Sequence, residues 1–298
     1  MKPVSSIVSR LALALAVSLL GCTSLAARTC GPDALGTTRI LEVGSEGGLE
    51  TGLKTYPRSL PLNDHELVLT FDDGPDARHT KTVLDALAAE CVRATFFLIG
   101  RNAESLPLLV RRELSDGHTI AHHTFSHPAV TLRGWATDKA LADIERGIQA
   151  DDKAAYGTAQ AKPRVPFFRF PGFADTPELL DALGKRNIAV FGTDIWASDW
   201  QAMSPEQELN LVMHRIEKAK RGVVLFHDTH PATAALMPQF LRELKMRGYK
   251  IVHIVPGAGK TRTINALPGW KSETQQILER MGFRHQPPEP LKLKPALH

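Results

Sequence analysis

Leu67-Val-Leu-Thr-Phe-Asp-Asp-Gly-Pro75 joins an apolar run to two adjacent carboxylates and a turn. The residues from Glu66 to Phe71 have the length and composition of a buried strand, and Asp-Gly-Pro is a common turn sequence. Two like charges held close together need a cation or a proton between them. The stretch therefore predicts either a functional pair, Asp72 and Asp73, or a well-formed turn with no further role.

Apolar runs of the same kind alternate with amphipathic stretches along the rest of the chain. We expect strands at 66–71, 94–99, 119–121, 167–170, 188–191, 223–226 and 250–254, and helices near 79–90, 102–116, 137–155, 176–186, 204–221 and 232–247. About seven strands separated by helices indicate a parallel α/β sheet, either open and doubly wound or closed into a barrel. In both architectures the active site lies at the C-terminal ends of the strands.

His123 and His127 follow one of these strand ends. A spacing of four places two side chains on one face of a helical turn, so both imidazoles could reach one ion. With a carboxylate from the first strand end they would form a two-histidine, one-carboxylate set, which leaves a position open for water on zinc. Surface histidines at this spacing also occur by chance, and His122 shows that the segment is rich in histidine.

Three further polar residues follow other expected strands. His227 ends the strand 223–226, and a nearby buried carboxylate such as Asp199 could hold it as an imidazolium that donates a proton. A histidine bonded into a loop would explain the same residue. Arg169 is flanked by apolar residues and needs a partner, such as a carboxylate whose pKa it would depress.

Five ordered segments carry a resemblance: Thr70–Pro75, His123–His127, Arg169–Pro171, Asp199-Trp200 and Leu225–Asp228. Together they resemble the five motifs of the NodB-type polysaccharide deacetylases, the carbohydrate esterase family 4, over about Leu67 to Ile254. The resemblance implies an α/β fold, a distorted (β/α)7-8 barrel. It also implies a hydrolase acting on carbon-nitrogen bonds other than peptide bonds.

The resemblance also implies residue roles. Asp73, His123 and His127 would bind a divalent metal, usually zinc in that family, and Asp72 would be the general base. A water on the metal would attack the carbonyl carbon of an N-acetyl group, and His227 would protonate the departing amine.

The remaining implied roles concern positioning and the substrate pocket. Arg169 would orient Asp72 and Asp199 would orient His227, while a backbone N–H after Pro171 would help to hold the oxyanion. Leu225 and Trp200 would wall the acetyl pocket.

The sequence departs from the family pattern near the expected sugar contacts. Gly172 followed by Phe173 stands where many members have Tyr or Trp, and Trp196 stands where a smaller polar residue is usual. These differences concern the sugar subsites and not the expected metal or base.

The expected substrate is a polysaccharide containing N-acetylglucosamine, such as peptidoglycan, chitin-like material or poly-N-acetylglucosamine, which would release acetate. An esterase removing O-acetyl groups from a xylan-type carbohydrate is an alternative with the same site. A catalytically silent, glycan-binding lipoprotein is a third possibility, although such silence usually follows loss of a ligand or base.

The N-terminus predicts export to the bacterial cell envelope. Lys2 and Arg10 precede an apolar run of about 10 residues that suits a signal peptide but not a membrane span. Leu19-Leu-Gly-Cys22 resembles a lipoprotein processing box, so Cys22 would carry a lipid anchor and the protein would face the periplasm. Plain secretion or periplasmic release, with cleavage near Ser24–Ala27, is the alternative.

These signals divide the chain into a signal peptide (1–21), an N-terminal extension or tether (22–63), a catalytic domain (64–256) and a C-terminal extension (257–298). We expect the region from Arg28 to Asn63 to be irregular, and one helix at 271–281. Cys30 and Cys91 could form a disulfide in an oxidising compartment, or Cys91 could be a buried, inert thiol.

Composition excludes several other classes of protein. The chain has 298 residues, 43% hydrophobic and 23% charged, with a formal charge of +4, which is ordinary for a globular domain. We expect no nucleic acid partner, because no dense basic run interleaved with aromatic residues is present. Pro256–Thr261 lacks the first glycine of a phosphate-binding loop, so no nucleotide is expected.

Overall fold

The computed structural model of the chain describes residues 30–129 and 131–283. The expected signal peptide and the expected lipidation residue Cys22 lie outside this part. Among the described residues, no helix combines the length and the apolar character needed to cross a bilayer.

The core of the molecule is a mixed-length, parallel sheet of ten strands. All seven expected strands are present. The strands are β1 (Thr37–Gly44), β2 (Glu50–Thr51), β4 (Glu66–Asp72), β5 (Thr95–Leu98), β6 (Thr119–His122), β7 (Phe167–Phe168), β8 (Ala189–Phe191), β9 (Ile195–Trp196), β10 (Gly222–His227) and β11 (Lys250–Gly257). A separate antiparallel pair joins β3 (Arg58–Ser59) to β12 (Ile264–Asn265).

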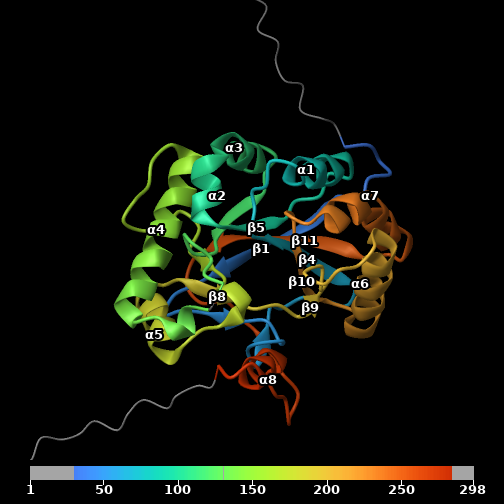
Figure 1. Cartoon of the computed structure of the whole chain (residues 1–298). Coiled ribbons are helices and arrows are strands. Elements are labelled where there is room, and N and C mark those ends of the chain that lie inside the picture. Colours follow the sequence, from blue (N-terminus) through green and yellow to red (C-terminus); the bar gives the residue numbers. More distant parts are fainter. Residues whose placement is uncertain (1–29, 130, 284–298) are drawn as a thin grey trace, which may run out of the picture.

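The sheet curls into an incomplete barrel, in which β4 is a central strand (Figure 1). From β4 it runs through β5, β6 and β7 to β8, and on the other side through β10 to β9. Among the described strands, β8 pairs with β2 and not with β9, so the ring is open between them. The α/β fold and the distorted barrel expected from the sequence are therefore confirmed.

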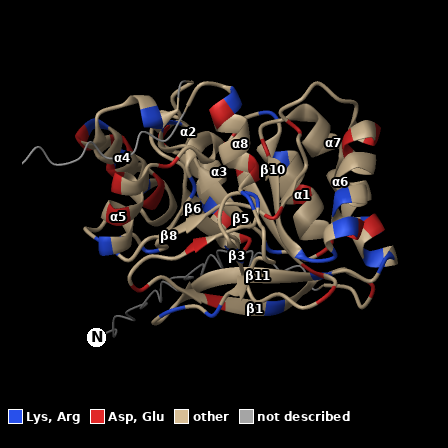
Figure 2. Cartoon of the chain, turned by 90° about the horizontal axis from the view of Figure 1, so that it is seen from below, with Lys and Arg blue, Asp and Glu red and all other residues tan. Residues whose placement is uncertain are grey.

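The helices cover the outside of the sheet and carry many of the charged residues, as α4 and α6 illustrate (Figure 2). They are α1 (Thr80–Ala89), α2 (Gly100–Ser105), α3 (Pro107–Ser115), α4 (Thr137–Tyr156), α5 (Pro177–Lys185), α6 (Pro205–Ala219), α7 (Pro231–Met246) and α8 (Glu273–Arg280), with short 3-10 helices η1 (Leu132–Gly134) and η2 (Pro171–Phe173). The expected helix at 102–116 is two helices, because Pro107 starts a new one.

Capping explains two of these helix starts. Ser204 accepts from the backbone N–H of Gln207, whose side chain bonds back to Ser204 and completes a capping box for α6. Thr176 caps α5 in a similar way through the N–H of Leu179.

The region before residue 64 is not irregular, which corrects one sequence prediction. Thr37–Gly44 forms β1, which pairs with β11, and Glu50–Thr51 forms β2, which pairs with β8. Along β1 the residues alternate between half-buried and exposed positions before the buried end. The sequence does not predict this strand, because its apolar residues are few and the glycines that follow it favour a loop.

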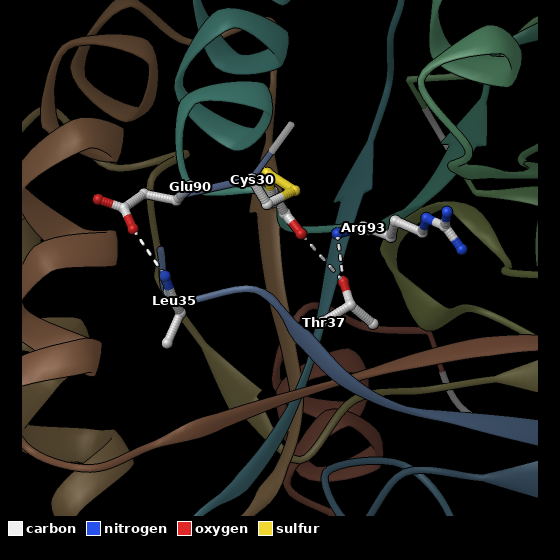
Figure 3. The surroundings of a disulfide bond; sticks show 6 residues. Cys30, Leu35, Thr37, Glu90 and Arg93 are labelled. Atoms are coloured by element: carbon white, nitrogen blue, oxygen red, sulfur yellow. Dashed lines mark hydrogen bonds between the residues drawn. A yellow bond between two sulfur atoms is a disulfide. The ribbon is translucent and has the colours of Figure 1, made fainter. Parts of the chain in front are cut away.

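Cys30 and Cys91 form a disulfide that fastens the start of the described chain to the end of α1 (Figure 3). Two hydrogen bonds support this junction. Glu90 Oε2 accepts from Leu35 N at 2.8 Å, and Thr37 Oγ1 accepts from Arg93 N at 2.8 Å. Two alternatives were open for Cys91, a disulfide and a buried thiol, and the structure contains the disulfide.

Candidate active site

The two adjacent carboxylates lie at the C-terminal end of β4, as expected. Asp72 is the last residue of the strand, level with His227 on β10. Asp73 takes a left-handed backbone conformation with φ 73°, which Asp tolerates better than most residues. Asn102 Nδ2 donates to the carbonyl oxygen of Asp73 at 2.8 Å. The turn therefore sends the two carboxylates in different directions.

Gly74 continues this turn, and it has no room for a side chain. A Cβ there would lie 2.5 Å from both carboxylate oxygens of Asp228. Asp228 is fully buried, and its carboxylate accepts a hydrogen bond from Thr80. Burial, opposed by the bond from Thr80, raises its pKa to about 7. This packing of Asp228 under the turn could not be predicted from the sequence.

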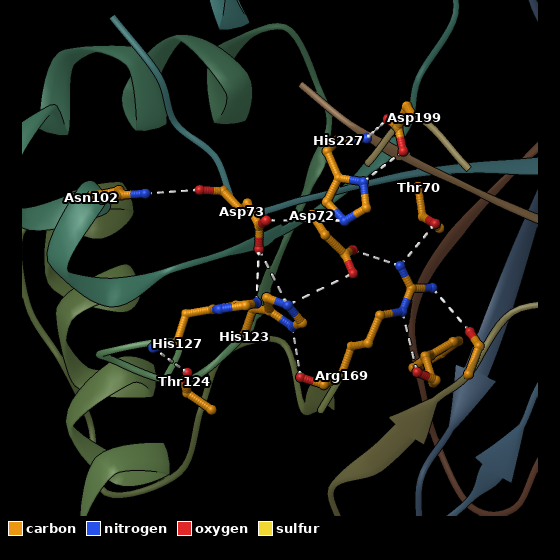
Figure 4. Close-up of polar contacts among 12 residues, drawn as sticks. Thr70, Asp72, Asp73, Asn102, His123, Thr124, His127, Arg169, Asp199 and His227 are labelled. Atoms are coloured by element: carbon orange, nitrogen blue, oxygen red, sulfur yellow. Dashed lines mark hydrogen bonds and ion pairs between the residues drawn. The ribbon is translucent and has the colours of Figure 1, made fainter. Parts of the chain in front are cut away.

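Asp73, His123 and His127 meet as a three-residue cluster (Figure 4). Asp73 Oδ1 lies 3.4 Å from His123 Nε2 and 3.3 Å from His127 Nε2. Bond lengths of about 2.0–2.2 Å in a tetrahedral zinc site place neighbouring ligand atoms about 3.4 Å apart. Asp73 Oδ1 is buried without a hydrogen-bond partner in the described structure. The donor set and its spacing therefore fit a divalent metal.

The orientation of His123 also suits a ligand. Its Nδ1 lies 2.8 Å from the carbonyl oxygen of Arg169, which can accept only from a protonated Nδ1. This bond leaves the lone pair of Nε2 directed at Asp73. The ionised form of Asp73 is favoured too: burial opposes it, but neighbouring histidine cations, His227 among them, lower the pKa of Asp73 below its ordinary value.

The helical turn predicted for His123 and His127 is wrong. The segment after β6 is extended and bent, with left-handed backbone at Thr124 and His127, and the N–H of His127 donates to Thr124 Oγ1 at 3.1 Å. The two histidines approach each other through this bend. Gly147 of α4 packs against it so closely that a Cβ would lie 2.4 Å from the Thr124 backbone carbon.

Arg169 is fully buried and pairs with Asp72, as the sequence predicted. Its Nη1 lies 2.6 Å from Asp72 Oδ1 and 3.0 Å from Thr70 Oγ1. Its other nitrogens donate to the carbonyl oxygens of Phe191 and Gly192 at the C-terminal end of β8. Burial lowers the pKa of Arg169, which Asp72 opposes. These bonds fix the carboxylate of Asp72 in one orientation.

His227 and Asp199 form a second ion pair on the other side of the pocket. His227 Nδ1 lies 2.8 Å from Asp199 Oδ1, and the backbone N–H of His227 donates to Asp199 Oδ2 at 2.5 Å. Burial lowers the pKa of His227, but Asp199, Asp73 and Asp72 together raise it to about 10. A metal cation beside Asp73 would offset part of this rise in the pKa of His227. His227 can therefore carry a proton that its Nε2 presents to the pocket.

A buried network behind Asp199 was not predicted. Thr233 Oγ1 lies 2.9 Å from Asp199 Oδ2 and 3.0 Å from Glu208 Oε1. A hydroxyl has one proton to donate, so one of the two carboxyls must supply a proton of its own. Burial, with the nearby charge of Asp199, raises the pKa of Glu208 to about 7. Glu208 is thus the carboxyl that carries the proton below about pH 7, whereas the pKa of Asp199 is lowered, burial being opposed by His227.

All five residues expected to contact substrate line one pocket of about 660 Å³, together with Asp72, Asp73, His123, His127 and His227. They are Pro171, Gly172, Phe173, Trp200 and Leu225. Trp196 lines it as well. Arg215 holds the segment after β9 by donating to Trp196 O at 2.6 Å and Ser198 Oγ at 2.7 Å.

Residues of α8, and Met281 directly after it, also line this pocket, which the sequence did not predict. Thr274, Ile277, Leu278 and Met281 all belong to the lining. The expected helix at 271–281 gave no indication of where it would pack.

Comparison with known proteins agrees with this arrangement. Residues 60–191 match the sequence model described as polysaccharide deacetylase. A peptidoglycan-N-acetylglucosamine deacetylase of Bacillus cereus is 33% identical over 214 residues, which cover 68% of this chain and 92% of that protein. Another protein of that name from the same organism is 52% identical over 202 residues, 66% of this chain and 70% of that one. A chitooligosaccharide deacetylase of Sinorhizobium fredii is 31% identical over 179 residues, which cover 60% of this chain and 79% of that protein.

A solved structure of a peptidoglycan deacetylase is similar in both fold and sequence. The peptidoglycan deacetylase Bd3279 of Bdellovibrio bacteriovorus superimposes with a TM-score of 0.65 and 31% identity, covering 74% of this chain. The present chain spans only 60% of that protein.

Proposed function

The chain belongs to the polysaccharide deacetylase family, and we propose that it removes N-acetyl groups from a polysaccharide that contains N-acetylglucosamine, releasing acetate. One observation carries the proposal. Three potential metal ligands, Asp73, His123 and His127, face a carboxylate held by Arg169 and a cationic histidine held by Asp199 in one pocket. The names of the relatives, which refer to peptidoglycan and chitooligosaccharides, support an N-acetylglucosamine substrate.

A divalent metal held by Asp73, His123 and His127, zinc by our proposal, would supply a Lewis acid that lowers the pKa of a water and polarises the acetyl oxygen. Asp72 then accepts the proton of the attacking water. It is suited to this role because Arg169 fixes its Oδ1 at 2.6 Å, while its Oδ2 lies 3.8 Å from His123 Nε2 on the metal-binding side. The backbone N–H of Gly172, which follows Pro171, would donate to the oxyanion.

His227 completes the reaction by protonating the nitrogen that leaves. An amine is a poor leaving group unless it receives a proton as the carbon-nitrogen bond breaks. Asp199 holds His227 through Nδ1, so the proton on Nε2 is the one that faces substrate. Leu225 and Trp200 would enclose the acetyl methyl group.

The test compares substrates that separate the candidate activities. Acetate release would be measured from N-acetylglucosamine oligomers, peptidoglycan and acetylated xylan. We expect release from the N-acetyl substrates, because a protonated His227 at the leaving group matters more for an amine than for an alcohol. Release from acetylated xylan alone would replace the proposal with the O-acetyl esterase, and no release from any substrate would contradict both.

We also propose that the protein works in the cell envelope, anchored through a lipid on Cys22. The support is the sequence of the first 22 residues, with its short apolar run and its Leu-Gly-Cys ending. A Cys22→Ser variant should leave the membrane fraction, as shown by fractionation and immunoblotting. Retention of that variant in the membrane would contradict the anchor without affecting the proposed reaction.

A further inference from the structure

We propose that α8, in the C-terminal extension, is part of the substrate-binding surface and packs against the sugar unit next to the one that loses its acetyl group. The inference rests on the proposed function, because it states where the glycan of that reaction lies beyond the acetyl pocket. We call the residues Thr274, Ile277, Leu278 and Met281 the pocket face of α8.

The pocket face is one side of the helix. Its members are spaced by three, one and three residues, which places them in a row on one surface of an α-helix. All four line the same pocket as Asp72 and His227. By contrast, Gln276, Glu279 and Arg280 are exposed to solvent. The helix therefore turns its least polar side toward the active site.

The helix is held firmly in this position. Lys54 O accepts from Thr274 N at 3.0 Å and from Ser272 Oγ at 3.2 Å, and Lys54 Nζ lies 2.6 Å from Glu273. Just before the helix, Trp270 Nε1 donates to Leu53 O at 2.7 Å. Figure 1 shows α8 in red beside the blue segment that contains these partners. These bonds at the start of α8 hold the helix in place at one side of the pocket.

Arg133 contacts both the first turn of the same helix and the chain just after its end. Its guanidinium donates to Gln275 Oε1 at 3.0 Å and to the carbonyl oxygen of Phe283 at 3.2 Å, and it pairs with Asp175 at 3.2 Å. The position of α8 therefore depends on both the N-terminal extension and the catalytic domain.

A row of aromatic rings in the same pocket connects this region to the proton donor. Ring centroids are 6.3 Å apart for Phe173 and Trp196, 6.0 Å for Trp196 and Trp200, and 6.0 Å for Trp200 and His227. A pyranose ring has a face of C–H groups that packs on such apolar surfaces while its hydroxyls point to water. The rings and the pocket face of α8 together suit an occupant of this amphipathic kind.

Exposure and size point to the same occupant. Trp200 is 47% exposed and Met281 is 64% exposed, and both lie on this one pocket. Large apolar side chains that remain in water around a pocket commonly mark a binding surface. The volume of about 660 Å³ lies within the range of about 300–1,000 Å³ that holds ligands far larger than an acetyl group. The space beyond the acetyl pocket is therefore sufficient for a further sugar.

The experiment compares a long and a short substrate in variants of the full chain. Ile277→Asp places a charge in the pocket face, Met281→Ala removes an exposed side chain from it, and Gln276→Asp adds the same charge on the solvent side. The long substrate is the tetramer of N-acetylglucosamine, and the short one is 4-nitrophenyl acetate, which offers an acetyl group without a sugar.

We expect Ile277→Asp to raise KM for the tetramer about tenfold, equivalent to about 1.4 kcal/mol of binding. Met281→Ala should raise it less, and kcat should stay within about twofold. Both variants should lose much less activity on 4-nitrophenyl acetate than on the tetramer, and Gln276→Asp should match the wild type on both substrates.

Two results would overturn the inference alone: an unchanged KM for the tetramer in Ile277→Asp, or an equal loss on both substrates, which would reveal a general disturbance of the fold. A wild-type enzyme that releases no acetate from the tetramer would instead overturn the proposed function, and this inference with it.

Discussion

At the scale of single residues, the structure separates two neighbouring carboxylates into different environments. Asp72 faces the buried guanidinium of Arg169, whereas Asp73 faces two imidazoles. Adjacent aspartates can differ in this way because Asp73 has left-handed backbone and Gly74 lets the turn pack on Asp228. We therefore expect substitutions of the two residues to have different consequences.

Asp72→Asn should still bind metal but lose turnover by at least about 100-fold, because an amide cannot accept the proton of the attacking water. Asp73→Ala should lose the metal itself, since it removes one of three ligands. Metal content by elemental analysis and acetate release together check both statements. Normal turnover in Asp72→Asn, or a full metal content in Asp73→Ala, would contradict the proposed roles.

Glu208 gives a prediction of pH dependence. Its pKa is raised from 4.5 to about 7, so the folded protein holds a proton that the unfolded chain releases above about pH 4.5. The folded state binds more protons in this window, so the stability contributed by Glu208 falls as pH rises from about 4.5 to about 7. Glu208→Gln cannot ionise and should avoid this loss.

Thermal unfolding at about pH 5 and about pH 8 tests the prediction. The drop in melting temperature between the two should be smaller in Glu208→Gln than in the wild type, while the exposed Glu206→Gln should behave as the wild type does. If Glu208→Gln shows the full wild-type drop, Glu208 is not the neutral member of the network with Thr233 and Asp199.

At the scale of elements, the bend at Thr124 and His127 brings the histidines together, and its packing against α4 can be tested. Gly147→Ala would ordinarily stabilise a helix by about 1 kcal/mol. Here a Cβ would lie 2.4 Å from the Thr124 backbone, so we expect the opposite. The variant should have a lower melting temperature and weaker metal binding than the wild type, as measured by calorimetry.

Gln149→Ala is the matched control for this substitution. Gln149 lies on the same helix but is exposed, so its replacement should leave metal affinity unchanged. Equal metal affinity in Gly147→Ala and the wild type would show that α4 does not position His123 and His127.

The elements also show how far the sequence could be interpreted. Long apolar runs such as Leu67–Phe71 and well-capped starts such as Ser204 were predicted correctly, because their signals are local. The bend at Thr124 and His127 could not be predicted, since it depends on the close approach of Gly147 from a distant helix. The position of α8 depends likewise on Lys54 and Arg133, far away in the sequence.

The candidate site follows the same division. The residues assigned to the proposed chemistry could be expected to lie together, because each follows an apolar strand and together they resemble a known family. Thr233 and Glu208 could not, because they support Asp199 only through contacts between α6 and α7. Local patterns therefore indicate the proposed reaction, whereas the supporting contacts and the wall of the pocket formed by α8 depend on the fold.

At the scale of the whole molecule, both extensions are integrated into the catalytic domain. β1 pairs with β11, Arg133 bonds to Gln275 of α8, and the disulfide between Cys30 and Cys91 ties the start of the described chain to α1. The disulfide closes a loop with a sequence separation of 61 residues. It joins the end of the sheet where the strands begin, opposite the carboxyl ends that carry the active site.

Removing this disulfide should therefore affect stability and not chemistry. A Cys30→Ser, Cys91→Ser double variant should be less stable by about 4 kcal/mol, from the entropy of the loop that it no longer closes. Denaturant unfolding measures this difference, and kcat at a temperature well below unfolding should match the wild type. A large loss of kcat in a variant that remains folded would show that the junction also shapes the active site.

The central claim is that Asp73, His123 and His127 hold a metal on which acetate release depends. The most direct measurement is acetate release from the N-acetylglucosamine tetramer by the wild-type enzyme after treatment with a chelator and again after one equivalent of zinc is returned. We predict that activity disappears with the chelator and returns with zinc, and that His127→Ala fails to recover. Undiminished release in the presence of chelator, with the metal shown to be absent, would contradict the account.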